Sequence, residues 1–203
     1  MTQETSVKGE EPAEESDGRR RRGQDNRARI VAAMLEIIRG GDMSPSADQV
    51  AARADVGLRT VFRHFKDMDS LYSEMSVVIE SELHSIVGTP FKSTAWKDRI
   101  VELVDRRAVA FEKITPFKYA SEAYRHRSRF LDQDSGKLVT ALRAILEREL
   151  PKAMVDNPLK VEALDLLLSF EVWSRLRREQ GLSIQQASDV LRATVRRLLD
   201  DEA

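Results

Sequence analysis

The 203-residue sequence contains no cysteine, which excludes disulfide bonds, thiolate zinc sites and cysteine nucleophiles. Its only histidines are His64, His84 and His126, and none has a partner at the spacing of a metal-binding motif such as H-E-x-x-H. The phosphate-binding pattern G-x-x-x-x-G-K-[ST] and the hydrolase pattern G-x-S-x-G are also missing. These absences argue against an enzyme, and no cofactor or metal ion is expected.

Long apolar runs are missing as well. No stretch approaches the roughly 18 apolar residues that cross a membrane. Residues 1–16 are polar and acidic, without the apolar core of a signal peptide. We therefore expect a soluble cytoplasmic protein with no membrane partner.

Residues that interrupt helices are sparse, with nine glycines and six prolines, whereas Ala, Leu, Glu and Arg are frequent. Hydrophobic residues make up 41% of the sequence and charged residues 33%, which is common in helical proteins with many exposed faces. Apolar residues recur at helical spacing along the chain, in about nine segments. The expected fold class is all-α.

Basic charge is concentrated in one part of the chain, although the net charge is only −1. Residues 1–18 are acidic, and residues 67–203 are nearly balanced. Residues 19–66 carry 11 basic and five acidic side chains, a net of +6. A small basic segment of this kind is typical of a module that binds a polyanion.

The basic segment has the pattern of a helix-turn-helix. A first helix is predicted from Asp25 or Asn26 to the Gly40-Gly41 pair, and Ser46 with Gln49 forms a capping box before a helix over 47–54. A turn of only three residues, 55–57, precedes a helix over 58–65. Two short helices joined in this way after a longer one predict a helix-turn-helix.

The stretch GLRTVFRHF, residues 57–65, separates into two faces at about 100° per residue. We expect one face to pack on the domain: Leu58, Val61, Phe62 and Phe65. The other face is polar and could enter a DNA major groove: Arg59, Thr60, Arg63 and His64. Arginine can bind guanine in bidentate fashion, and the methyl group of threonine can contact that of thymine.

The remaining chain predicts further helices. A fourth helix starts near Asp67, another runs from Trp96 and is closed by Pro116, and a short one covers 117–124. An apolar stripe over 138–146 ends at Pro151. Asn157-Pro158 opens a helix through residue 176 that is apolar nearly all round and therefore expected to be central, and a capping box at 183–186 opens the last helix.

In order and spacing, residues 26 to about 75 resemble the TetR (tetracycline repressor) family of bacterial regulators. The matching motifs are R-A-R-I-V-A-A-M-L, V-A-x-R-A-x-V, T-V-F-R-H-F and D-x-x-L-Y. The resemblance implies a tail over 1–24, which the acidic composition predicts to be disordered, a DNA-binding domain over 25–67, and an effector-binding and dimerisation domain over 68–203. It implies contacts to double-stranded DNA by Ser46, Gly57, Leu58, Arg59, Thr60, Phe62, Arg63, His64 and Lys66.

Further partners follow from the same resemblance. A homodimer would form through the last two long helices and bind a near-palindromic operator, from which a small-molecule effector releases it. Candidate effector-pocket residues are the aromatic side chains Trp96, Phe111, Phe117, Tyr124, Phe170 and Trp173, although for any single one of them core packing is favoured over ligand contact. The arginine run Arg19, Arg20, Arg21 and Arg22 is either a DNA-contacting arm or part of a solubilising tail.

The sequence departs from the family pattern at four positions. Phe62 stands where a tyrosine is usual and Met68 where a lysine often opens the fourth helix, so two contacts to the DNA backbone are expected to be lost. Asp55 and Gly57 replace the usual glycine and serine of the turn. Two alternatives to an effector-released repressor stay open: a regulator of the same fold that activates or answers to a partner protein, and a helical interaction scaffold.

Overall fold

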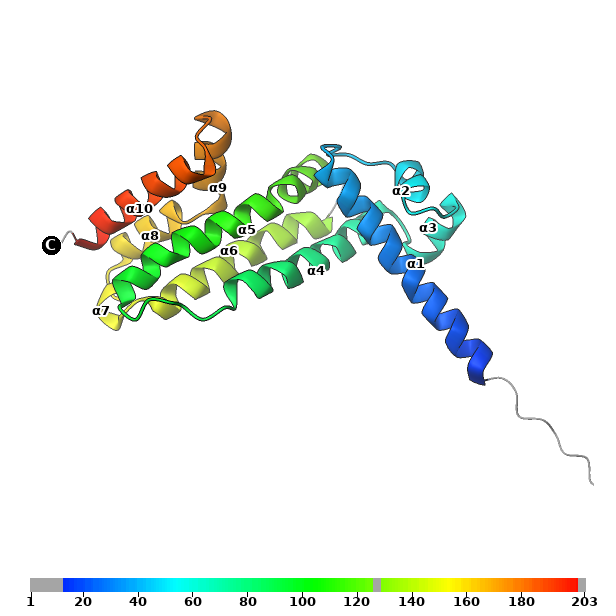
Figure 1. The fold of residues 1–203 in the computed structure, drawn as a ribbon, viewed down its shortest axis with the longest axis horizontal. Coiled ribbons are helices and arrows are strands. Elements are labelled where there is room, and N and C mark those ends of the chain that lie inside the picture. Colours follow the sequence, from blue (N-terminus) through cyan, green and yellow to red (C-terminus); the bar gives the residue numbers. More distant parts are fainter. Residues whose placement is uncertain (1–12, 126–128, 201–203) are drawn as a thin grey trace, which may run out of the picture.

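The expected all-α class is confirmed by a computed structural model, which describes residues 13–125 and 129–200 (Figure 1). The described residues form ten α-helices, one π-helical turn and no strand. The helices are α1 (Ala13–Arg39), α2 (Ala47–Arg53), α3 (Leu58–His64), α4 (Met68–Val87), α5 (Trp96–Tyr124), α6 (Arg129–Glu149), α7 (Lys152–Val155), α8 (Pro158–Leu167), α9 (Phe170–Ser174) and α10 (Ile184–Asp200), and the π-helical turn is Arg175–Glu179. No helix in the described part of the chain is both long and apolar enough to span a membrane.

Helices α1, α2 and α3 and the first turns of α4 share one hydrophobic core at the N-terminal end of the molecule (Figure 1). Its largest buried side chains include Ile30, Met34 and Ile38 from α1, Phe65 after α3, and Tyr72 from α4. The predicted stop of α1 is confirmed, because Gly41 takes a φ of 103° that favours glycine. The predicted capping box is also present, since Ser46 Oγ accepts from the amide of Gln49 and the Gln49 side chain accepts from the amide of Ser46.

Helix α1 begins earlier than expected. The sequence predicts its start at Asp25 or Asn26, but the helix runs from Ala13 and includes the arginine run at 19–22. Glu and Arg favour helix, and the two glycines at 18 and 23 each cost only about 1 kcal/mol in a helix, so they do not end it. The arginine side chains themselves lie outside the described ones.

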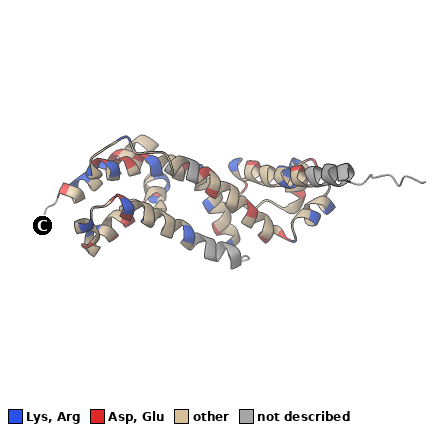
Figure 2. Ribbon diagram, turned by 90° about the horizontal axis from the view of Figure 1, so that it is seen from below, with Lys and Arg blue, Asp and Glu red and all other residues tan. Residues whose placement is uncertain are grey.

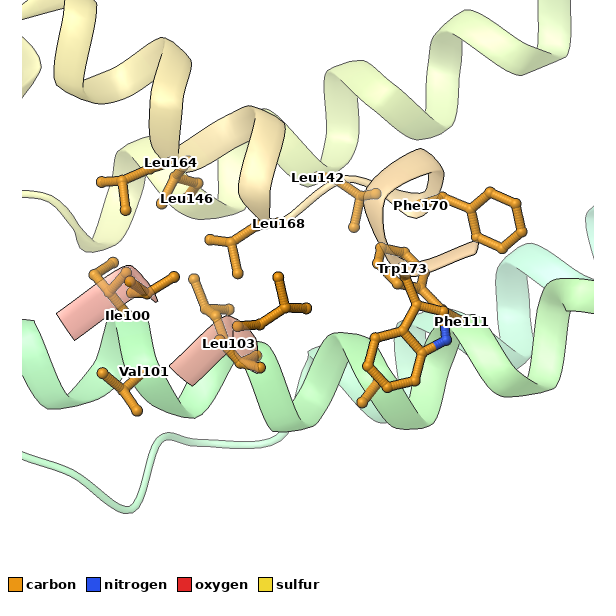
Figure 3. Close-up of a cluster of buried hydrophobic side chains, with 14 of the residues drawn as sticks. Ile100, Val101, Leu103, Phe111, Leu142, Leu146, Leu164, Leu168, Phe170 and Trp173 are labelled. Atoms are coloured by element: carbon orange, nitrogen blue, oxygen red, sulfur yellow. The ribbon is translucent and has the colours of Figure 1, made fainter. Parts of the chain in front are cut away.

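The second core lies between α5, α6, α8, α9 and α10. Figure 3 shows Ile100 and Leu103 of α5 facing Leu146 of α6 and Leu164 of α8. Helices α4, α5 and α6 run side by side, and α8 and α10 lie near the N-terminal half of α5 (Figure 1). Helix α4 thus connects the N-terminal core to this bundle.

The prediction that Pro116 closes a helix is wrong. Proline lies inside α5, which continues without interruption from Trp96 to Tyr124 and absorbs the short helix expected at 117–124. Proline removes one N–H of the ladder and strains the preceding turn, at a cost of about 3 kcal/mol. Tertiary packing outweighs this cost, since Ile114 and Phe117 on either side of the proline are both buried.

The long central helix expected from Asn157 is divided. Asn157 caps α8 as predicted, but the helix ends at Leu167, and Ser169 starts α9 by accepting from the amide of Val172. The buried guanidinium of Arg107 donates to the carbonyls of Leu168 and Leu142, both at 2.6 Å, and so satisfies an acceptor at the break. Burial lowers the pKa of Arg107 to about 10, with a smaller opposing effect of Asp165.

The apolar residues of α8 are not all buried. Its residues Leu159 and Leu166 are 83% and 64% exposed, so this part of the chain lies at the surface and only one face of it is central. Val161 and Leu164 form the buried face.

Candidate nucleic-acid interface and cavity

Arginines of α1 hold both ends of α3 in place. Arg29 donates to the carbonyl of Ala54 at 2.7 Å and thereby fixes the turn before α3. Arg27 donates to the carbonyl of His64 at 2.8 Å, pairs with Glu74 of α4 at 2.7 Å, and stacks over the ring of Phe65 at 4.4 Å. Helix α3 is therefore braced against α1 and α4 rather than held by its own seven residues.

The buried face of α3 contains fewer residues than the apolar face that the sequence pattern predicts. Val61 and Phe65 are buried, as predicted, but Leu58 and Phe62 are 38% and 48% exposed. The prediction that all four residues pack on the domain is thus wrong for Leu58 and Phe62. Since residues three and four apart lie on one face of a helix, the exposed strip of α3 consists of Leu58, Arg59, Phe62 and Arg63.

Thr60 and His64 lie at the margin of this strip. Both are half-buried, and His64 Nε2 is enclosed without a hydrogen-bond partner among the described residues. A Cβ atom at Gly23 of α1 would lie 4.0 Å from His64 Cε1. Burial, Arg63 and Arg27, in that order, lower the pKa of His64 below its ordinary value. His64 is therefore turned toward α1.

The basic side chains of this end of the molecule divide into two groups. Arg27, Arg29 and Arg53 form ion pairs with Glu74, Asp55 and Glu36 and serve the packing of the helices. Arg59, Arg63 and Lys66 are exposed, and no carboxylate of the described residues lies within ion-pair distance of them. On the described helices in the rest of the molecule, both basic and acidic residues occur (Figure 2). The exposed strip thus offers cations that the described carboxylates do not neutralise.

The other candidate residues of this surface lie around the ends of α2 and α3. Ser46 is exposed at the start of α2 while it caps that helix. Gly57 precedes α3 with a φ of −72°, and a Cβ atom there would meet nothing within 4 Å, so the backbone does not require glycine. Asp55 has a φ of 51°, the left-handed conformation that explains why glycine is usual at its position.

A cavity of about 600 Å³ lies between α4, α5 and α6. Its wall is mostly apolar, with Ile79 and Leu83 from α4, Ala110, Phe111, Ile114 and Phe117 from α5, and Leu138, Ala141, Leu142 and Ile145 from α6. Charged side chains also line it: Glu80, Lys118, Glu122, Arg125, Lys137 and Arg148. A cavity of this size accommodates a drug-sized molecule.

Of the six aromatic residues proposed for a pocket, the structure places Phe111 and Phe117 on the cavity wall. Tyr124 instead stacks on Tyr72, with ring centroids 4.4 Å apart, and Phe170 meets Phe111 edge to face. Trp173 is buried and donates to Glu112 at 2.9 Å, and Trp96 packs against the second core. Sequence reasoning missed Ser76, Ile79 and Lys118, because nothing in a helical pattern shows which turns of α4 and α5 face a space.

Comparison with known proteins identifies the fold. No protein-family model and no curated protein matches the sequence. Among solved structures, a TetR transcriptional regulator from Rhodococcus sp. RHA1 is similar, with a TM-score of 0.55 over 88% of this chain and 97% of that chain, at 18% sequence identity. The protein therefore has the fold of a TetR regulator, with α2 and α3 as its helix-turn-helix, and the resemblance found in the sequence is confirmed at the level of fold.

Proposed function

We propose that the protein is a cytoplasmic, sequence-specific DNA-binding transcription regulator that acts as a repressor. The observation that carries the proposal is the exposed strip of α3, in which Arg59 and Arg63 have no carboxylate partner among the described residues while α1 braces the helix. A major groove admits one α-helix, and phosphates and base edges supply the acceptors that these guanidinium groups lack. A helix held in one position suits the recognition of bases, because the base edges in the groove also have set positions.

We propose a role in DNA binding for each residue of this surface. Arg59 and Arg63 would bind guanine O6 and N7, and the exposed Phe62 and Leu58 would contact thymine methyl groups or the sugars. Lys66 and Ser46 would meet phosphates at either side. The half-buried Thr60 and His64 would take secondary places at the margin, and the arginines at 19–22 of α1 remain candidates for further backbone contacts.

A homodimer through α8 and α10 is part of the proposal. Leu159 and Leu166 of α8 and Val190 of α10 are large apolar side chains exposed in the single chain, which a second copy would cover. Two-fold symmetry would place two α3 helices in successive major grooves, about 34 to 36 Å apart, and so would require a near-palindromic operator.

The cavity provides a route for control by a small molecule. Helix α4 contributes Leu71 and Met75 to the core around α1 and α3, and Ile79 and Leu83 to the cavity wall. A ligand that shifts α4 would therefore alter the position of α3. Such a ligand releases DNA only if it binds the non-DNA conformation more tightly.

Selection of bound sequences from random DNA, followed by binding measurements over a salt series, tests the proposal. We expect a near-palindromic sequence whose affinity falls steeply between about 50 and 200 mM salt. Absence of sequence-selective binding at any salt concentration would contradict the repressor and favour an interaction scaffold. Selective binding that no small molecule alters would favour control by a partner protein.

The substitution Arg63→Ala tests the role of the strip. We expect it to weaken operator binding by about 1 to 3 kcal/mol and to relax the preference at one base position, because one bidentate contact is lost. Lys152→Ala is the matched control, since it removes one exposed positive charge at α7, the opposite end of the molecule (Figure 1). Equal losses on operator and random DNA would assign Arg63 to phosphate contacts instead.

A further inference from the structure

Among the cations of the cavity wall, Lys118 differs in having no carboxylate partner among the described residues. Lys118 of α5 lines the cavity, and its ammonium group lies 5.4 Å from the centre of the Phe170 ring. No carboxylate of the described residues lies within ion-pair distance of it. Its neighbours on the same face of α5 are Ile114, Phe117 and Ser121, which also line the cavity. Lys118 thus places a positive charge beside an apolar surface, and no described residue supplies it with a negative partner.

The other charged groups of the wall are already engaged. Glu122 pairs with Arg125 at 2.7 Å, and Arg148 pairs with Glu149 at 3.2 Å. Glu80 and Lys137 have interaction partners as well. Among the lining residues that the structure describes there are four cations and two carboxylates, so the wall carries an excess of positive charge.

We propose that the cavity binds an amphipathic organic carboxylate, with the apolar body between α4, α5 and α6 and the carboxylate on Lys118. The proposal rests on the function proposed above and names the chemical class of its effector. An apolar ligand without a charge would cover the Lys118 ammonium and leave it without a partner, which is costly for a charged group. A cationic ligand would meet the same ammonium, while the lining carboxylates are engaged elsewhere.

Calorimetric titration of the full-length protein tests the ligand class. The probes are octanoate, dodecanoate and hexadecanoate, each compared with the alcohol and the ammonium compound of the same chain length below its micelle concentration. We expect saturable binding of at least one carboxylate, roughly tenfold or more tighter than its alcohol, because only the carboxylate adds an opposite charge to its hydrogen bond with the ammonium group. Equal or tighter binding of the alcohol or the ammonium compound overturns the proposal, as does the absence of saturable carboxylate binding.

Three variants test the assignment to this cavity. Lys118→Met should weaken the carboxylate about tenfold and leave the alcohol unchanged. Lys113→Met is the matched control, because Lys113 is an exposed lysine on the same helix that does not line the cavity. Ser121→Phe should weaken carboxylate and alcohol alike by filling space. Unchanged carboxylate affinity in Lys118→Met, with the folded state checked by circular dichroism, overturns the assignment.

A parallel measurement of DNA binding separates this inference from the proposed function. If the wild-type protein binds no DNA selectively but binds carboxylate in a Lys118-dependent manner, the regulator proposal fails and the ligand class stands. If it binds an operator and the carboxylate does not release it, the ligand class stands and the effector role fails. If operator binding responds to the alcohol instead, the regulator proposal stands and the ligand class is wrong.

Discussion

At the scale of single residues, α3 shows how two phenylalanines three positions apart take different roles. Phe65 follows α3 and is buried beneath the guanidinium of Arg27, whereas Phe62 is about half exposed on the strip with Arg59 and Arg63. The first stabilises the domain, and the second is available to a partner. Phe62 lacks the hydroxyl of the tyrosine that is usual in the family, and an apolar contact takes its place in the interface proposed here.

The two phenylalanines predict opposite results on truncation. Phe65→Ala should destabilise the protein by about 3 to 5 kcal/mol, because it leaves a cavity in the core. Phe62→Ala should change the free energy of unfolding by less than about 0.5 kcal/mol while weakening DNA binding. Urea unfolding and operator binding of both variants check this. A large loss of stability in Phe62→Ala would mean that its exposed face is not available for DNA.

The sequence could predict the candidate interface only in part, for a reason visible in α3. The spacing of Leu58, Val61, Phe62 and Phe65 defines an apolar arc but not which part of the arc the neighbouring helices cover. Coverage is set by α1 through Arg27, which contacts His64 of α3 from 37 residues away in sequence, and through Arg29, which contacts Ala54 before α3 from 25 residues away. For the same reason the enclosed position of His64 against Gly23 has no signal in the local pattern.

At the scale of elements, the connection between α4 and α5 is fastened to α5 by one ion pair. Arg106 donates to the carbonyls of Thr89 and Pro90 and stacks over the Phe91 ring at 3.9 Å. Glu102 accepts from Arg106 at 2.7 Å and from the amides of Lys92 and Ser93. The far end of α4 is thereby held while its first turns belong to the N-terminal core.

The interactions of Glu102 predict that the stability of the protein depends on pH. Burial alone would raise the pKa of Glu102, but hydrogen bonds from Arg106 and from the amides of Ser93 and Lys92 outweigh it and lower the pKa to about 2. Because the folded pKa is depressed below the ordinary 4.5, the stabilisation is present above about pH 4.5 and is lost as the pH falls toward 2. Glu102→Gln should therefore be less stable than wild type near neutral pH, and the difference should shrink in acid.

Urea unfolding of both proteins over a pH series measures this difference. Glu171→Gln serves as the control, since it removes an exposed carboxylate of α9. A difference between Glu102→Gln and wild type that stays constant down to about pH 2 would show that the carboxylate does not stabilise the connection through its charge.

Element boundaries were predictable where local chemistry decides them. Ser46, Asn157 and Ser183 each cap a helix at the predicted position, because a capping hydrogen bond spans only three residues. The predicted boundaries were wrong where contacts with residues distant in sequence determine the end of a helix. Burial of Ile114 and Phe117 carries α5 through Pro116, and Arg107 meets the carbonyl of Leu168 at the break before Ser169, 61 residues along the chain.

At the scale of the whole molecule, α5 belongs to both hydrophobic cores. Its residues from Ile100 to Ile114 lie in the core shared with α6, α8 and α10, and Phe117 and Ala120 lie in the core shared with α1 and α4. Phe117 also lines the cavity, and the guanidinium of Arg39 at the end of α1 lies 5.2 Å from its ring. One side chain therefore touches both the proposed ligand space and the helix-turn-helix unit.

Shared packing predicts a single thermal transition. Because α5 contributes buried side chains to both cores, we expect the two cores to unfold together in scanning calorimetry, with one peak for the full chain. Phe117→Ala should lower the melting temperature and separate the trace into two components. Two resolved transitions in the wild-type protein would show that the cores unfold independently.

Pro116 lies between Ile114, the last α5 residue of one core, and Phe117, the first of the other. Proline has no N–H, so the carbonyl one turn earlier receives no ladder hydrogen bond at this point. Bending α5 here breaks fewer bonds than bending it elsewhere, and the packing within each core is preserved. The cost of bending α5 is therefore lowest at the position where the two cores meet.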